Sequence, residues 1–240
     1  MTSGNSSGSS SGTPRQLPLQ IRLDDSATFD NYCVAPAGRA LAEYLQPLQE
    51  LQQFSFLWGN GGVGKTHLLQ ALCHAAEAES LSAFYLSLQH YQDYSPLLFE
   101  QLETFDLVCL DDVEAIAGQP EWEQGLFSLF NRMRDSGARL VVTSKVGPRQ
   151  LSMTLPDLLS RLQSGVVFQV PQLDDVDKIR ALQLRARLRG FELGDDVASY
   201  VLQRNARSMH SLFDLLERLD QRSLETGRRI TIPLVRQLLD

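Results

Sequence analysis

Short apolar runs alternate with longer segments in which apolar side chains recur at helical spacing. The runs predict buried strands over residues 54–58, 83–88, 106–112, 139–144 and 166–170. The amphipathic segments predict helices over residues 37–51, 67–78, 91–102, 121–134 and 155–162. Strands that alternate with helices form a parallel sheet covered on both faces. We therefore predict an α/β fold built on a five-stranded parallel sheet.

The pattern changes after Pro171, where only helical spacing remains. It predicts helices over residues 174–188, 195–203 and 208–224, and leaves a fourth open over 233–239. Asp174 suits the N-cap of the first of these helices, and Gly190 suits its end. We therefore expect an α/β domain over residues 25–171 and a small α-helical domain, placed as a lid, over residues 172–240.

The first residues differ in composition from the rest. Residues 1–14 are mostly Ser and Gly, so we expect a disordered tail, either a flexible leader or an artificial addition. Residues 15–24 follow as a linker that contains the amphipathic hexapeptide QLPLQI at 16–21. Composition alone favours a plain linker or edge strand for this hexapeptide; a short docking peptide is the alternative.

Composition limits the class of protein. The 240 residues are 43% hydrophobic, which is enough to bury a real core. The net charge of −7 argues against wrapping much nucleic acid by electrostatics alone. The three cysteines lie among apolar neighbours without metal-binding spacing, so we expect free buried thiols in a reducing compartment. Neither a signal peptide nor a membrane-spanning window is evident, and we expect a cytoplasmic protein.

The strongest functional signal follows the first predicted strand. Residues 59–66, GNGGVGKT, match the phosphate-binding pattern G-x-x-x-x-G-K-[ST] between a strand and a helix. In this pattern the glycines let successive backbone N–H groups point at a phosphate, and the following helix presents its positive end. Lys65 would lie by the β- and γ-phosphates, and Thr66 would bind Mg²⁺. The expected nucleotide-binding residues here are Gly59, Asn60, Gly61, Gly62, Val63, Gly64, Lys65, Thr66 and His67.

Two acids end the strand predicted at 106–112. Apolar residues that run directly into carboxylates form the Walker B pattern, in which Asp111 would hold Mg²⁺ through water and Asp112 would orient the attacking water. An acidic pair at a strand end is also a common turn signal. The phosphate loop earlier in the chain favours the functional interpretation. Thr143, Ser144 and Lys145 end the next strand, where they would face the terminal phosphate.

The predicted helix over 174–188 carries Lys178, Arg180, Arg185, Arg187 and, just past its end, Arg189. Such a basic run is usually a solvated face, and binding to nucleic acid or an acidic partner is the alternative.

A phosphate-loop domain followed by a helical lid, with an arginine on a short helix before the last strand, resembles the AAA+ class. The motifs TFDNY at 28–32, GKTHLL at 64–69, LDD at 110–112 and VTS at 142–144 resemble DnaA. The motifs IAG at 116–118, LPDL at 155–158, SRL at 160–162, ALQLRAR at 181–187 and LF at 212–213 are similar to the Hda type of the DnaA-related AAA+ family. The resemblance runs from about Arg15 to the end.

This resemblance implies a function. Hda-type proteins bind ADP, dock on the DNA polymerase sliding clamp through an N-terminal peptide, and stimulate hydrolysis of DnaA-bound ATP. The resemblance places the clamp-binding residues at Gln16, Leu17 and Leu19, and it makes Arg161 an arginine finger that acts on a neighbouring subunit's nucleotide. A surface ion pair is the alternative role of Arg161. We expect ADP or ATP with Mg²⁺ as cofactors, DnaA and the clamp as partners, a homo-oligomer (dimer), and contact with DNA mainly through the clamp.

The sequence departs from this pattern at three positions. Asp112 is one methylene shorter than the Glu of vigorous AAA+ ATPases, and Lys145 stands where DnaA has an acid. His210 lies near the position of the lid's sensor arginine, with Arg207 one turn earlier as a substitute that would also contact nucleotide. We expect slow hydrolysis by this chain itself, which suits a regulator better than a motor.

Two other functions share the phosphate loop. A DnaA- or DnaC-like initiator or helicase loader would act directly on DNA. DnaA has a basic helix-turn-helix domain after its lid, and we expect none here because these 240 residues leave no room for one. A kinase or GTPase would need neither Arg161 nor a lid, and the guanine motif N-K-x-D is absent from the sequence.

Overall fold

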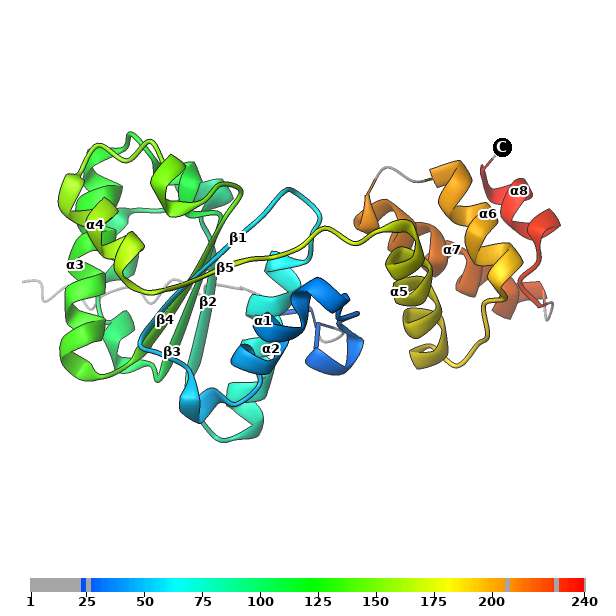
Figure 1. The fold of residues 1–240 in the computed structure, drawn as a ribbon, viewed down its shortest axis with the longest axis horizontal. Helices are drawn as coiled ribbons and strands as arrows, with labels where there is room; N and C mark the ends of the chain where they lie inside the picture. Colours follow the sequence, from blue (N-terminus) through cyan, green and yellow to red (C-terminus); the bar gives the residue numbers. More distant parts are fainter. Residues whose placement is uncertain (1–22, 25–26, 206–207, 227–228, 240) are drawn as a thin grey trace, which may run out of the picture.

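The computed structural model describes residues 23–24, 27–205, 208–226 and 229–239. Five strands form one parallel sheet, in the spatial order β2-β3-β4-β1-β5 (Figure 1). They are β1 (Phe54–Trp58), β2 (Ala83–Ser87), β3 (Leu107–Asp111), β4 (Arg139–Ser144) and β5 (Val166–Gln169). The predicted five-stranded parallel sheet is confirmed, and no strand end differs from its prediction by more than one residue.

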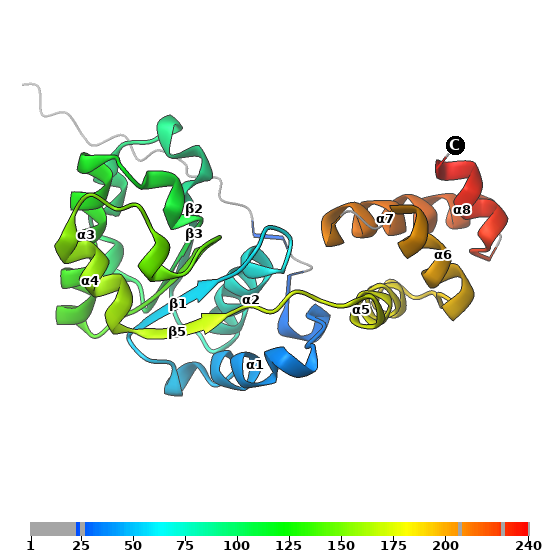
Figure 2. The same cartoon turned by 45° about the horizontal axis from the view of Figure 1, so that its top comes forward.

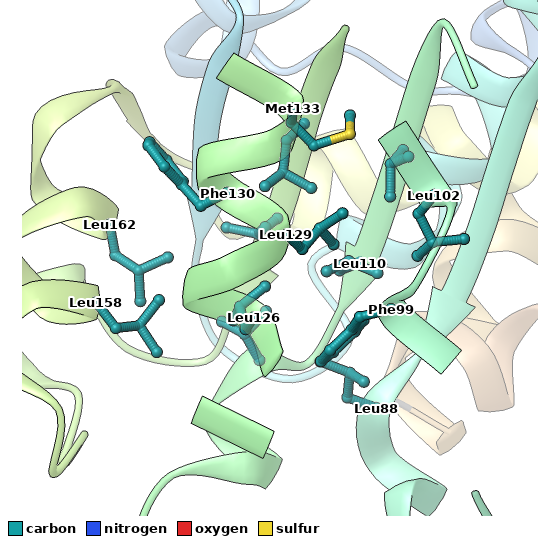
Figure 3. Close-up of a cluster of buried hydrophobic side chains, with 14 of the residues drawn as sticks. Leu88, Phe99, Leu102, Leu110, Leu126, Leu129, Phe130, Met133, Leu158 and Leu162 are labelled. Atoms are coloured by element: carbon teal, nitrogen blue, oxygen red, sulfur yellow. The ribbon is translucent and has the colours of Figure 1, made fainter. Parts of the chain in front are cut away.

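Helices cover both faces of the sheet (Figure 2). On one face lie α1 (Arg39–Leu45) and α2 (Lys65–Ala78), and on the other lie α3 (Pro120–Ser136) and α4 (Pro156–Ser164). Alternation along β1 divides the core, because Phe54 and Phe56 face α3 while Leu57 faces α2. Figure 3 shows the α3 side, where Leu126, Leu129 and Phe130 pack between the sheet and α4.

Four helices follow the sheet and gather in a separate part of the molecule (Figure 1): α5 (Asp175–Leu188), α6 (Asp195–Asn205), α7 (Met209–Thr226) and α8 (Ile232–Leu239). They share their own hydrophobic cluster, in which Leu182, Val201, Leu216 and Val235 are fully buried. The Asp174 carboxylate accepts a hydrogen bond from the Asp177 N–H at 2.8 Å and so caps α5. None of the described helices combines the length and the apolar character needed to cross a membrane.

Two predicted helices are wrong. Residues 91–102 form three short 3-10 helices, Leu88–Asp93, Pro96–Phe99 and Leu102–Thr104, instead of one α-helix. Pro96 has no N–H for a continuous helix, and Gln101 adopts a left-handed φ of 68°. The helix predicted over 37–51 is α1 alone, followed by a 3-10 turn over Leu48–Glu50, because Pro47 cannot donate the next helical hydrogen bond.

Gly165 joins α4 to β5 in a space that has no room for a larger residue. A Cβ atom there would lie 2.6 Å from the Phe54 carbonyl oxygen and would also overlap the Phe54 ring. We expect Gly165→Ala to lower the free energy of unfolding by about 1–3 kcal/mol, because the start of β1 must shift. Chemical denaturation measures this loss. In Gly61→Ala the added Cβ meets nothing within 4 Å, so an equal loss in that control variant would contradict the steric explanation.

Candidate functional site

The loop between β1 and α2 lies at the carboxyl edge of the sheet. The Gly59 N–H donates to the Ser144 carbonyl at 3.1 Å, which ties the loop to the end of β4. Gly62 and Gly64 have φ values of 79° and 95°, in the region that favours glycine, and Gly64 is the residue before α2. The curled loop and the start of α2 thus have the form of an anion-binding cradle.

The segment that precedes α1 packs against this loop. A Cβ atom on Gly64 would lie 2.9 Å from the Tyr32 ring, and the Tyr32 ring lies 5.6 Å from that of His67. His67 Nε2 is 2.8 Å from the Thr28 carbonyl oxygen. Burial raises the pKa of Tyr32 to about 12, so its hydroxyl stays neutral in a closely packed environment. The 28–32 segment therefore fixes the outer side of the loop.

Lys65 is buried with its ammonium group folded back on the loop. Its Nζ donates to the carbonyls of Gly59 at 2.7 Å and Asn60 at 3.1 Å. Burial lowers the pKa of Lys65, and the carboxylates of Asp112 and Asp111 oppose this shift. An ammonium group has three donors, so these two bonds leave one for a phosphate oxygen.

Asp111 connects three elements at the end of β3. Its Oδ2 accepts from the Thr66 hydroxyl at 2.5 Å and from the Tyr85 hydroxyl at 3.2 Å, and its Oδ1 accepts from the Thr143 hydroxyl. The predicted metal pair, Thr66 and Asp111, therefore lies together. No three His, Cys, Asp or Glu side chains among the described residues are grouped as a metal site. A hydroxyl and a carboxylate suit Mg²⁺ when phosphate and water supply the other ligands.

Asp112 follows with a left-handed φ of 56°, and its N–H donates to the Thr143 hydroxyl at 3.1 Å. Burial raises its pKa, as do the neighbouring charges of Asp111 and Glu114. Lys145 Nζ lies 3.5 Å from Glu114 Oε1. The sequence pattern does not single out Glu114, because a glutamate in a turn after a strand carries no motif of its own.

The helical lid completes a cleft of about 480 Å³ over the loop. Lys65, Thr66, Asp112 and Lys145 line one side, and Arg185, Arg189, His210 and Phe213 line the other. Gly62, Gly64 and Met209 also border an adjoining cavity of about 60 Å³, lined by the apolar Tyr32, Val63, Leu173 and Ala181. A cleft that places charged and polar side chains over the phosphate loop, beside a small and largely apolar cavity, suits a nucleotide.

The lid's positive charges differ from the prediction. His210 is 86% exposed, and its Nε2 lies 3.3 Å from Asp214, while Arg207 lies outside the described residues. Arg185 stacks over the Phe213 ring at 5.2 Å and lines the cleft. The basic run is not one solvated face, because Arg185 and Arg189 line the cleft whereas Lys178 and Arg180 pair with acids on their own helix. Helical spacing alone does not say where α7 lies, so it could not single out Arg185.

Arg161 lies far from its own phosphate loop. It lines a hollow of about 340 Å³ with Phe54, Leu140 and Val166, which belong to the beginnings of β1, β4 and β5. The loop lies at the opposite ends of these parallel strands. The Arg161 guanidinium carbon is 5.8 Å from the Phe130 ring centroid, and Arg161 pairs with no acidic side chain among the described residues.

A buried carboxylate fixes the helix that carries Arg161. Glu123 of α3 is 0% exposed and accepts from the backbone N–H groups of Gly118 (2.7 Å), Thr154 (2.8 Å) and Leu155 (2.7 Å), and from the Thr154 hydroxyl (2.9 Å). Burial raises the pKa of Glu123, but the donated hydrogen bonds outweigh it and the net pKa is lowered. Thr154 and Leu155 directly precede α4, so Glu123 sets where α4 begins.

Comparison with known proteins identifies the family. The bacterial DnaA ATPase domain model matches residues 23–169, and the Hda lid domain model matches residues 175–239. The chain is an Hda-like member of the DnaA-related AAA+ family. The DnaA-related family acts in the initiation of DNA replication. Gln16, Leu17 and Leu19, which the sequence resemblance predicts to bind the clamp, lie outside the described residues of this Hda-like chain.

Solved structures show the same fold. Domain III of the DnaA replication initiation protein from Thermotoga maritima has a TM-score of 0.75 and 24% identity, covering 91% of this chain and 97% of that one. DnaA from Aquifex aeolicus, bound to AMPPCP, has a TM-score of 0.71 and 23% identity, and the match covers 85% of this chain and 68% of that one. The RuvB Holliday junction branch migration motor from Thermotoga maritima has a TM-score of 0.63 and 14% identity, covering 88% and 72%. At these identities the likeness shows the AAA+ fold alone.

Removing the buried carboxylate should loosen α4. We expect Glu123→Ala to lower the free energy of unfolding by about 3 kcal/mol at pH 7, because three backbone donors lose their acceptor. The folded-state pKa of Glu123 is lowered, so its stabilising effect is present above the ordinary value near 4.5 and is lost as pH falls through the folded-state pKa. Urea unfolding of the wild type and of Glu123→Gln between about pH 7 and pH 3 measures this. Equal pH dependence in both proteins would contradict it.

Proposed function

We propose that this Hda-like protein is a nucleotide-bound regulator of replication initiation that stimulates hydrolysis of the ATP held by DnaA. It acts together with the DNA-loaded sliding clamp and so prevents re-initiation. The observation that carries the proposal is the position of Arg161 at the edge of the sheet opposite its own phosphate loop. From there its guanidinium group is available to a nucleotide on another protein.

The cleft supports binding of ADP or ATP by this chain. Lys65 and the N–H groups at the start of α2 offer donors to the phosphates, and the small apolar cavity next to Tyr32 suits a base. DnaA from Aquifex aeolicus carries the ATP analogue AMPPCP on the same fold. Thr66 and Asp111 would hold Mg²⁺ against the phosphates, where the ion would neutralise their charge.

The site favours holding a nucleotide over hydrolysing it. Asp112 is a short acid in a left-handed conformation, so its carboxylate extends less far toward an attacking water than the Glu of vigorous AAA+ ATPases would. His210, which lies near the position expected for a lid sensor arginine, is paired with Asp214. Slow turnover would keep the protein in one nucleotide state while it acts on DnaA.

Arg161 would provide the catalytic charge to DnaA. An arginine finger stabilises the phosphate oxygens that gain charge in the transition state, and such a finger is worth roughly 10³–10⁵ in rate. Its guanidinium group lies over the Phe130 ring, and this cation–π contact favours one direction of the side chain. Because Glu123 fixes the start of α4, the finger is presented on a rigid helix.

The decisive experiment measures hydrolysis of DnaA-bound ATP in the presence of DNA-loaded clamp, with and without this protein. We expect the wild type to accelerate it, and Arg161→Ala to reduce the acceleration by roughly 10³ or more while ADP binding is unchanged. Arg222→Ala removes an exposed arginine that pairs with Glu225 within one turn of α7, and it should behave as the wild type.

Several outcomes would contradict this function. Stimulation that survives Arg161→Ala would exclude the finger. Lys65→Ala should lose nucleotide and its ligand-dependent rise in melting temperature, so an unchanged Tm response to ADP would exclude the cleft. Rapid ATP turnover and DNA binding by the chain alone, without DnaA, would favour the alternative of an initiator or helicase loader.

We further propose that Gln16, Leu17 and Leu19 bind the sliding clamp as a short extended peptide. Replacing all three residues with Ala should abolish clamp binding in surface plasmon resonance and leave the melting temperature unchanged. Replacement of Ser6, Ser7 and Ser9 in the preceding Ser/Gly stretch is the matched control. Unchanged clamp binding by the triple variant would return the segment to a plain linker.

A further inference from the structure

We propose that Arg134 is a recognition residue on the surface that carries Arg161, and that it binds an acidic side chain of the neighbouring DnaA subunit. This inference rests on the proposed function, because it concerns the surface that would meet DnaA. Arg134 lies near the end of α3 and lines the same hollow of about 340 Å³ as Arg161. Arg161 would act on the bound nucleotide, whereas Arg134 would set the affinity for the protein that holds it.

Phe130 brings the two arginines to one place. Arg134 follows Phe130 by one helical turn, so both residues lie on the same face of α3. The Arg161 guanidinium carbon comes from α4 and lies 5.8 Å from the centroid of the Phe130 ring, which points toward α4 in Figure 3. The Gln53 amide group donates to the Arg134 carbonyl at 3.2 Å. This hydrogen bond ties the end of α3 to the residue before β1 and so fixes the edge of the hollow.

The hollow combines positive charge with an apolar floor. The floor is formed by Phe54, Phe130, Met133 and Leu140, none of which is more than 8% exposed. The rim carries the two guanidinium groups together with amide and hydroxyl side chains, and none of the described residues that line the hollow is acidic. An aspartate or glutamate fits this arrangement, because its methylene groups would lie on the floor while its carboxylate accepts from a guanidinium group.

Arg134 can exchange its present partner for one on DnaA. Its Nη2 lies 3.3 Å from the carboxylate of Asp135, the next residue of the helix, and Asp135 is 72% exposed. An exposed ion pair of this kind contributes little. A carboxylate that entered the hollow from DnaA would be shielded from water by the two proteins, so its attraction to Arg134 would be stronger. Complementary charges of this kind fix the register of two surfaces, and Arg134 would thus align DnaA with Arg161.

The test titrates this protein against ATP-bound DnaA in the presence of DNA-loaded clamp. It measures the maximal rate of ATP hydrolysis and the protein concentration that gives half of that rate. We expect Arg134→Glu to raise the half-maximal concentration about 10-fold or more, because like charges repel across an interface, and to leave the maximal rate within about twofold of the wild type. Arg134→Lys keeps the charge and should restore most of the affinity. Added salt should weaken the wild type more than Arg134→Ala.

Two further variants separate this role from net charge and from catalysis. Arg39→Glu makes the same change of charge at an exposed residue of α1, which packs on the other face of the sheet, and it should behave as the wild type. Arg161→Ala should show the opposite pattern, because it lowers the maximal rate. Arg134 is 47% exposed, so the melting temperature of its variants should match that of the wild type.

Each failure gives a different result. An unchanged half-maximal concentration in Arg134→Glu, or a loss confined to its maximal rate, would overturn the role of Arg134. Loss of self-association in sedimentation velocity with an unchanged response to DnaA would also overturn it, because the hollow would then bind a second copy of this chain. A wild-type protein that fails to stimulate DnaA at any concentration would instead overturn the proposed function.

Discussion

The Asp111 carboxylate is the interaction on which the arrangement of the cleft depends. It is almost fully buried and accepts hydroxyl hydrogen bonds from α2, β2 and the end of β4. A buried charge is tolerated only when its hydrogen bonds are made, so these elements must meet in one geometry. That geometry fixes the phosphate loop against the carboxyl edge of the sheet and places Asp112 and Lys145 beside it. The candidate nucleotide site is therefore built from the same hydrogen bonds that join these elements to the sheet.

A second buried carboxylate organises the opposite half of the molecule. Glu123 joins the turn that follows β3 to the start of α4, and α4 carries Arg161 to the other edge of the sheet. The core between α3 and the sheet separates the two edges and is closely packed (Figure 3). A rigid body of this kind can hold one nucleotide and present a guanidinium group to another. The proposed function uses both ends of the sheet, the cleft for this chain's own nucleotide and Arg161 for the nucleotide of DnaA.

Much of the fold could be predicted because its signals are local. The strands are short apolar runs, the lid helices have clear periodicity, and the phosphate loop has a distinctive pattern of glycines. The prediction failed over residues 91–102, where leucines at helical spacing belong to three 3-10 turns. There Pro96 and the left-handed Gln101 override the periodicity, since backbone geometry limits a helix more strictly than side-chain pattern does.

The sequence by itself determined the five strands, the lid helices, the phosphate loop, the acids that end β3 and the family. Each of these depends on residues that are neighbours in the chain or on motifs of fixed spacing. Only the tertiary structure decided that Arg185 lines the cleft, that Glu123 anchors the start of α4 and that Glu114 pairs with Lys145. These contacts join residues from different elements, and they matter because the groups that they join are partly or fully buried. An amino-acid pattern does not record which charge will be taken out of water or which partner will meet it there.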